Sequence, residues 1–271
     1  MNDAVSWNAR AWCMTPAGGR WMVLLALASA LSCIAPAVAD DAPPSWDRPG
    51  IAFSPAVLPA GSFDWEQGLP DLEHDNMDGA RSTDYTADSN LRYGLTSTLE
   101  VQLLTSLWNE LDVHTMGFSS HMEGAGDTRL SLKWAPTLST KGLSFAMLGG
   151  VTFDTGSAPF TSGHSVETLG ATLGQDLGGG RSIAAYANVD HSDGANVWTT
   201  SANFGFPISG NFGGYLEVGH VDGDGATSTV AGGGVTYLVD NRVQFDLYAR
   251  HGLTSESPDI QAGFGISVFW K

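Results

Sequence analysis

Charged side chains at alternating positions are the residues in this chain whose types and spacing could support chemistry. Arg92, Glu100, Lys133 and Asp246 each lie between two apolar or aromatic residues. Side chains in a strand point to opposite faces in turn, so each charge would lie on a polar face opposite an apolar one. A face that carries both signs of charge could conduct or bind a solute, or it could close on itself through salt bridges.

We expect these polar faces to meet in the interior of one structure. The candidate interior residues share that alternation, and they are Asp88, Arg92, Glu100, Gln102, Arg129, Lys133, Tyr186, Tyr215, Asp246, Tyr248 and Arg250. Two roles stay open for them, because small barrels are filled by their side chains whereas wide barrels leave an aqueous channel. The tyrosines could contact an aromatic solute or simply fill space.

Catalytic motifs are weak in this chain. Asp154-Thr155-Gly156 matches the turn of an aspartic protease, but that chemistry needs a second carboxylate and no second such turn occurs. The adjacent pairs His164-Ser165 and His191-Ser192 would point apart in a strand. We therefore expect no enzyme and no catalytic residue, and an outer-membrane lipid hydrolase is only a third hypothesis.

Acidic residues crowd two stretches that could be loops. Asp71, Glu73, His74, Asp75 and Asp78 form one of them, and Asp222-Gly-Asp224-Gly forms the other. Oxygen-rich loops can hold Ca²⁺, but neither stretch has the spacing of an EF-hand. The expected reading is solvated acidic loops with no metal and no cofactor.

Twelve strands are predicted from the alternation. Their approximate ranges are 61–69, 84–94, 98–106, 127–135, 143–153, 165–174, 182–190, 195–206, 212–221, 228–238, 243–251 and 260–270. Most are near the 9–11 residues that a tilted strand needs to cross a bilayer, whereas soluble strands are more often 5–6 residues long. The fold class is therefore all-β, as a transmembrane antiparallel up-and-down β-barrel, and a soluble sandwich is the rejected alternative.

Prolines and connection lengths support the same fold. After Pro70, the prolines fall between predicted strands or at their ends, as a closed sheet requires. Short connections alternate with longer acidic ones at 70–83, 107–126 and 154–164, which is typical of periplasmic turns and outer loops. We expect 107–126 and 154–164 to act as gates, and we expect Gly94 to pair with Thr98.

An export leader is predicted before the barrel. Residues 1–39 have the apolar run and the Ala37-Val38-Ala39 cleavage site of a signal peptide, so the protein should reach the outer membrane of a Gram-negative cell. Residues 40–60 hold five prolines and indicate an irregular periplasmic lead-in, with partial insertion into the barrel mouth left open, and 61–271 would form the barrel. The net charge of −17 excludes nucleic acid as a partner, because phosphates require a basic face.

Three stretches resemble a known family. They are Gly61-Ser-Phe-Asp-Trp-Glu-Gln-Gly-Leu-Pro70, Leu91-Arg-Tyr-Gly-Leu-Thr-Ser-Thr-Leu-Glu-Val101 and Gly124-Ala-Gly-Asp-Thr-Arg-Leu-Ser-Leu-Lys-Trp134. They are similar to the family called the putative meta-pathway of phenol degradation proteins, and the resemblance covers about 60–271. It implies an outer-membrane transporter-like barrel linked to the uptake of aromatic compounds.

The sequence thus predicts an outer-membrane channel for passive passage of a small solute. The alternative is a structural or adhesive barrel with a closed lumen that acts through its outer loops. The expected partners are outer-membrane lipid, lipopolysaccharide and the solute. The last strand should close the barrel near Phe63 and Trp65, with Phe245, Leu247, Phe264 and Ile266 facing lipid.

Overall fold

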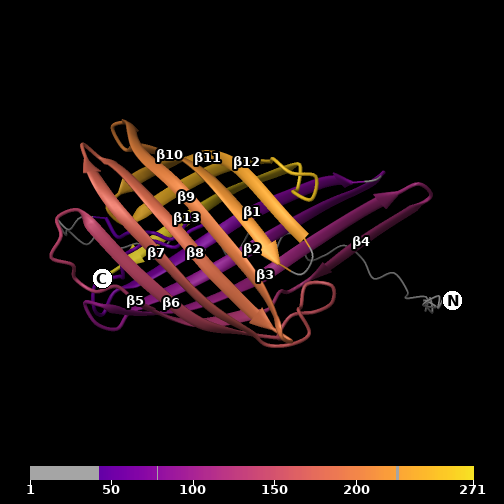
Figure 1. Cartoon of the computed structure of the whole chain (residues 1–271), viewed down its shortest axis with the longest axis horizontal. Coiled ribbons are helices and arrows are strands. Elements are labelled where there is room, and N and C mark those ends of the chain that lie inside the picture. The colour runs from indigo at the N-terminus through magenta and orange to yellow at the C-terminus, as the bar shows by residue number, and fades with distance from the viewer. Residues whose placement is uncertain (1–42, 78, 224–225) are drawn as a thin grey trace. The chain divides into compact units, whose positions relative to one another are not determined.

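The protein is an all-β barrel in its computed structural model, which describes residues 43–77, 79–223 and 226–271 (Figure 1). The predicted signal peptide at 1–39 lies outside these residues. The described residues contain no helix that is long and apolar enough to cross a membrane. They form thirteen strand segments: β1 (Phe63–Met77), β2 (Ala80–Gly94), β3 (Leu99–Thr115), β4 (Phe118–Gly124), β5 (Thr128–Trp134), β6 (Leu143–Phe153), β7 (Val166–Gly178), β8 (Arg181–Ser192), β9 (Ala195–Ser209), β10 (Phe212–Gly223), β11 (Ala226–Asp240), β12 (Val243–Gly252) and β13 (Ile260–Trp270).

Antiparallel pairing joins all of these segments into one closed sheet. β5 pairs with the first part of β3, from Leu99 to Thr105, and β4 pairs with the second part, from Asn109 to Thr115. β4 and β5 therefore form one interrupted strand of a twelve-stranded barrel. β1 pairs with β13, with Phe63 opposite Trp270 and Trp65 opposite Val268. The predicted fold class and the predicted closure of the barrel are therefore confirmed. Closure leaves no edge, which a sheet inside lipid requires.

The two faces of the wall are inverted relative to a soluble protein. Leucines such as Leu132, Leu216 and Leu247 are exposed on the outside, whereas Arg92 and Glu100 are fully buried inside. Exposed aromatic residues also lie near strand ends, as membrane girdles require, at Tyr93, Trp134, Phe153 and Tyr237.

One predicted lipid contact is wrong. Leu247 and Phe264 are exposed, but Ile266 is only 4% exposed. Ile266 belongs to a small apolar cluster with Val243 and Val268, against which Trp65 and Phe245 pack. Its position on the outer face is as expected, but larger neighbouring side chains cover it.

The predicted outer loop at 70–83 is wrong, because β1 and β2 continue through it as a hairpin. A bulge in β1 between Gly68 and Asp71 breaks the register with β13. An added residue exchanges the two faces of a strand, so the alternation changes phase at the bulge and does not end there. Pro70 lies in the bulge, where no ladder hydrogen bond is needed.

The predicted loop at 107–126 is wrong for the same reason. Three residue steps in β3, from Ser106 to Asn109, oppose only two in β2, from Asp88 to Thr86. Beyond this bulge β3 runs to Thr115, and β4 returns along it from Phe118 (Figure 1). The result is a long β3–β4 hairpin at the opposite end of the barrel from the C-terminus.

The predicted register of the β2–β3 turn is displaced by two residues. Gly94 pairs with Glu100 rather than Thr98, and Arg92 pairs with Gln102. A shift of two keeps every side chain on its face, so Arg92 and Glu100 still share the interior. The weakly patterned stretches 165–174 and 228–238 also form strands, β7 and β11.

Lipid exposure of the outer wall gives a stability prediction. We expect Leu216→Arg, in the middle of β10, to lower the free energy of unfolding in lipid by about 2–4 kcal/mol, the cost of an arginine near the bilayer midplane. Leu253→Arg is the matched control, because Leu253 has similar exposure but lies in the connection between β12 and β13. Reversible urea unfolding in vesicles measures both, and equal costs would contradict the lipid-facing assignment.

Candidate functional site

The lumen of the barrel contains part of the chain itself. Residues 45–58, called here the inner segment, form no strand and contact the inward side chains of the wall. Successive contacts of its residues are with β1, β12, β10, β7, β5 and β3, so it follows the inside of the wall. Its geometry decides how much of the lumen is open.

The first anchor of the inner segment is a buried charge cluster around Arg92. The guanidinium donates to Glu100 at 2.8 Å and to Glu66 at 2.7 Å, and it pairs with Asp64 at 3.2 Å. Asp47 of the inner segment accepts from Lys133 at 2.8 Å. Arg92, Glu100 and Lys133 have no exposed side-chain surface. Removing one partner from such a cluster would leave an uncompensated buried charge, so the cluster holds wall and segment together.

The second anchor is Arg48 of the inner segment. Its two terminal nitrogens donate to Asp71 at 2.8 and 3.0 Å, and it also reaches Asp246 at 3.2 Å. A two-pronged contact of this kind fixes the guanidinium plane as well as its charge. The wall makes room for it with glycine, since a Cβ on Gly265 would overlap the Arg48 side chain.

The third anchor lies beside the second, on β10 and β12. Arg250 donates to Glu217 at 2.6 Å and to the Pro49 carbonyl oxygen at 3.0 Å. Glu217 also accepts from the backbone N–H of Ile51 at 3.1 Å. The Arg250 guanidinium lies over the Tyr248 ring, 4.2 Å from its centre. Here a wall ion pair binds backbone groups of the segment.

The remaining contacts close the path of the inner segment. Thr172 donates to the Phe53 carbonyl oxygen at 2.9 Å, and the Phe53 ring meets Tyr186 edge-on at 5.4 Å. The backbone N–H of Leu58 donates to Glu100 at 2.7 Å. Glu100 therefore has two roles. It accepts from Leu58 at the end of the inner segment, and it binds Arg92 in the charge cluster of the first anchor.

A cavity of about 300 Å³ remains between the inner segment and the wall. Its lining mixes charge, amides and aromatic rings, and includes Arg48, Phe53, Asp88, Gln102, Arg129, Tyr186 and Asn188. Arg129 differs from the other lumen arginines, because its Nε is buried and has no hydrogen-bond partner in the described part of the chain. Arg129 thus borders the cavity with one of its donors unused by the described residues.

The eleven candidate residues fall into two groups. Arg92, Glu100, Lys133, Asp246 and Arg250 lie in the anchors, with Tyr215 donating to the Pro49 carbonyl oxygen and Tyr248 stacked under Arg250. Asp88, Arg129 and Tyr186 line the cavity, and Gln102 lies both there and against Asp47. A role for any of them in solute passage stays a prediction.

Several interior residues were missed by the sequence analysis. Asp64, Glu66 and Glu217 alternate with apolar neighbours, so the same pattern could have found them. Asp71 falls in the acidic stretch 70–83, which the sequence assigns to a loop. Asp47 and Arg48 carry no pattern signal at all, since the inner segment has no strand alternation.

One predicted gate is a loop. The connection 154–165 is fixed at the outer end by Asp127, which lies between β4 and β5 and accepts from the N–H groups of Gly156 and Ser162, at 2.9 and 2.8 Å. Partial burial raises the pKa of the Asp127 carboxyl, but these N–H groups outweigh it and lower that pKa to about 2.

The same loop meets the β8–β9 turn through a serine and a histidine. The Ser192 hydroxyl is 2.7 Å from His164 Nδ1, and His164 Nε2 is 3.4 Å from the carboxylate of Asp193. The chain brings these groups together from separate connections, which spacing could not predict. Asp193 is largely exposed, so we interpret the contact as a fastening of the loop rather than a hydrolase site.

The chain was compared with known proteins. The family model described as “Putative MetA-pathway of phenol degradation” matches residues 46–269. No curated protein matches. Among solved structures, the COG4313 outer membrane channel from Pseudomonas putida F1 has a TM-score of 0.64 at 14% identity, covering 82% of this chain and 99% of that one. The KdgM porin in complex with disordered oligogalacturonate has a TM-score of 0.53 at 8% identity, covering 78% and 99%. At these identities the structural matches establish the barrel fold.

The Asp127 contacts give a pH prediction. A carboxyl whose pKa is depressed in the folded state stabilises the fold above its ordinary pKa of about 3.9, and this contribution is lost as the pH falls towards 2. We expect the loop 154–165 to resist proteolysis at pH 7. Pepsin, which works at acid pH, should cleave it faster at pH 2 than at pH 4, after correction for the activity of the protease.

The Asp127→Ala variant should lose this protection at neutral pH as well. Asp154→Ala is its control, because Asp154 lies in the same loop and is exposed. Equal protection in wild type and Asp127→Ala would contradict the role given to Asp127.

Proposed function

The chain belongs to the family described as “Putative MetA-pathway of phenol degradation”, and on that premise we propose that it is an outer-membrane channel for passive passage of a small solute. The inner segment is its constriction, and the cavity beside that segment is the place where the solute binds on its way. The partners are outer-membrane lipid around the wall, lipopolysaccharide at the outer leaflet and the solute in the lumen.

The cavity is the observation that carries this proposal. Its volume of about 300 Å³ exceeds the roughly 150 Å³ of an engineered cavity that binds benzene, so a solute with one aromatic ring would fit. Phe53 and Tyr186 offer ring faces and edges, and Arg129 offers a charged donor. A small aromatic solute with a polar or anionic group is therefore the proposed class.

Passage requires the inner segment to move. Three anchors hold it against the wall, and release requires water to solvate the charged groups that those anchors now pair. The same anchors favour the alternative, a barrel whose lumen stays closed and which acts through its outer loops and hairpins. Conductance separates the two.

Deletion of residues 43–58 should open the lumen. We expect the single-channel conductance in planar bilayers to rise severalfold over wild type, because the wall would then enclose a wider aqueous path. Gly219→Val should act in the same direction, since a Cβ there would overlap Ile51. Gly149→Val is the control, because a Cβ there meets nothing within 4 Å. Folded variants that never conduct would support the closed barrel instead.

Arg129 should set the charge preference of the passage. The guanidinium groups of Arg92 and Arg250 form salt bridges with carboxylates, whereas Arg129 lines the cavity and forms no salt bridge within the described residues. We expect Arg129→Gln to shift the reversal potential in a salt gradient towards cation preference. Arg181→Gln, at the exposed start of β8, should leave it unchanged. An unchanged reversal potential in Arg129→Gln would remove this residue from the pathway.

A further inference from the structure

The β3–β4 hairpin carries a histidine and three carboxylates on one face. Asp112 pairs with His121, and Glu110 pairs with Glu123. Directly opposed residues share a face of the sheet, and so do residues two apart in one strand, so the four side chains gather in one patch. The β3–β4 pairing fixes the backbone positions of these four residues, and therefore the spacing of their Cβ atoms.

The bulge in β3 places this patch outside the barrel. Even-numbered residues of β3 point inward below the bulge, as Glu100 and Gln102 do, and outward above it. Asn109, on the other face, is buried and hydrogen-bonds inside to Ser106. The patch therefore faces the exterior and is separate from the lumen and its cavity.

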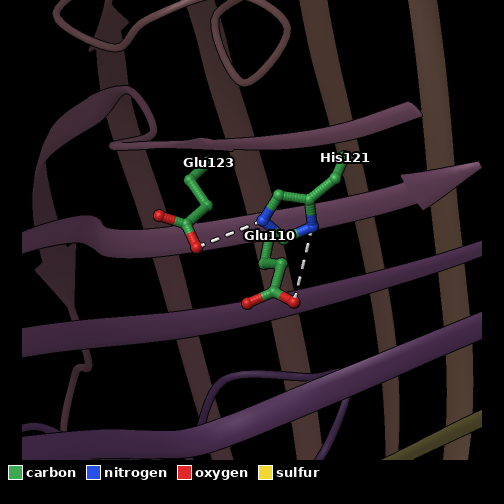
Figure 2. Close-up of side chains that lie close together, drawn as sticks. All are labelled: Glu110, His121 and Glu123. Carbon is green, nitrogen blue, oxygen red and sulfur yellow. Dashed lines mark hydrogen bonds and ion pairs between the residues drawn. The ribbon is translucent and has the colours of Figure 1, made fainter. Parts of the chain in front are cut away.

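The side chains of the patch already converge. His121 Nδ1 is 2.7 Å from Asp112 and 3.8 Å from Glu110, and His121 Nε2 is 3.3 Å from Glu123. Figure 2 shows the imidazole ring between the two glutamates. One ligand atom from each of Glu110, His121 and Glu123 lies within 4.8 Å of the other two, and no other such group occurs among the described residues.

Charge distinguishes this patch from the clusters in the lumen. There Glu100, Glu217 and Asp246 each pair with an arginine. Here the ion-pair partner of all three carboxylates within the described residues is the same imidazole. Glu110 is only 13% exposed at its side chain, and among the described residues its one ion-pair partner is that ring at 3.8 Å. A carboxylate that is this far desolvated is stabilised by a cation or by a metal ion.

We propose that this patch binds one divalent transition-metal ion through His121, Glu110 and Glu123, with Zn²⁺ as its reference ligand. Asp112 accepts the Nδ1 proton of His121, which orients the ring and leaves Nε2, on the side of Glu123, as the metal donor. The Glu110 carboxylate now lies beside Nδ1 and would turn towards the ion to complete the donor set. One nitrogen and two carboxylate oxygens make a donor set typical of Zn²⁺, and a fourth position stays open for water. Imidazole favours Zn²⁺, Cu²⁺ or Ni²⁺ over Ca²⁺ and Mg²⁺.

A bound ion would join β3 to β4 across the hairpin. The donors come from both strands, so the ion would hold their register where the hairpin extends beyond the barrel. It would be reached from the exterior, so its binding does not depend on whether the lumen conducts.

The test is a calorimetric titration of the full-length protein, purified in detergent and stripped with EDTA, using ZnCl₂. We expect one equivalent of Zn²⁺ to bind, with Ca²⁺ binding at least about 10-fold more weakly. His121→Ala should abolish the binding, and Asp112→Asn should weaken it by roughly 10–100-fold as a positioning residue. Replacing Zn²⁺ with Co²⁺ should give the visible absorption of a nitrogen- and oxygen-bound ion, which a merely structural role of His121 would not produce.

His114→Ala is the matched control. His114 lies on the same face of the same hairpin and hydrogen-bonds to Ser119, outside the proposed donor set. It should bind Zn²⁺ as wild type does. Heat-dependent gel mobility establishes that each variant is a folded barrel. Wild type that binds no Zn²⁺, His121→Ala that binds as tightly as wild type, or equal losses in His114→Ala and His121→Ala would each overturn the proposal.

Discussion

Closure of the backbone hydrogen-bond ladder is the constraint on which the rest of this structure depends. Lipid offers no partner to an unpaired N–H or C=O group, and each such group costs several kcal/mol. β1 must therefore pair with β13, and Phe63 meets Trp270 where they do. Once the sheet is closed, each strand has one face for lipid and one for the lumen. That division explains why leucines such as Leu216 lie outside and arginines such as Arg92 lie inside.

Closure also creates the problem that the inner segment solves. A ring of twelve strands is wider than one that its own side chains fill. Charged side chains on the inner face would stand in that space with few partners. Asp47 and Arg48 enter it and complete charge pairs with Lys133, Asp71 and Asp246. Gly265 leaves the space that Arg48 occupies, because the close approach of Arg48 excludes a larger side chain there.

The bulges in β1 and β3 then decide which carboxylates point into the lumen and which point outward. One added residue in β1 turns Asp71 into the lumen, where Arg48 binds it. Another in β3 turns Glu110 and Asp112 out of the lumen, where they meet His121 and Glu123. The two carboxylate groups have similar composition in sequence, yet one neutralises the inner segment and the other forms a patch on the exterior. A single residue step in each strand accounts for the difference.

The alternation of apolar and polar residues determined the strands and the face of residues such as Arg92 and Lys133, and strand lengths, proline positions and connection lengths determined the barrel. The face of each residue can be predicted because side chains alternate along a strand and only one face of the sheet contacts lipid. The tertiary structure decided the positions of the bulges and the path of the inner segment, which the alternation does not encode. Bulges change the phase of the alternation, so 70–83 and 107–126 read as loops. The path of the inner segment, the partners of Arg48 and the meeting of Ser192 with His164 depend on contacts between residues far apart in the chain, and local sequence has no period that encodes them.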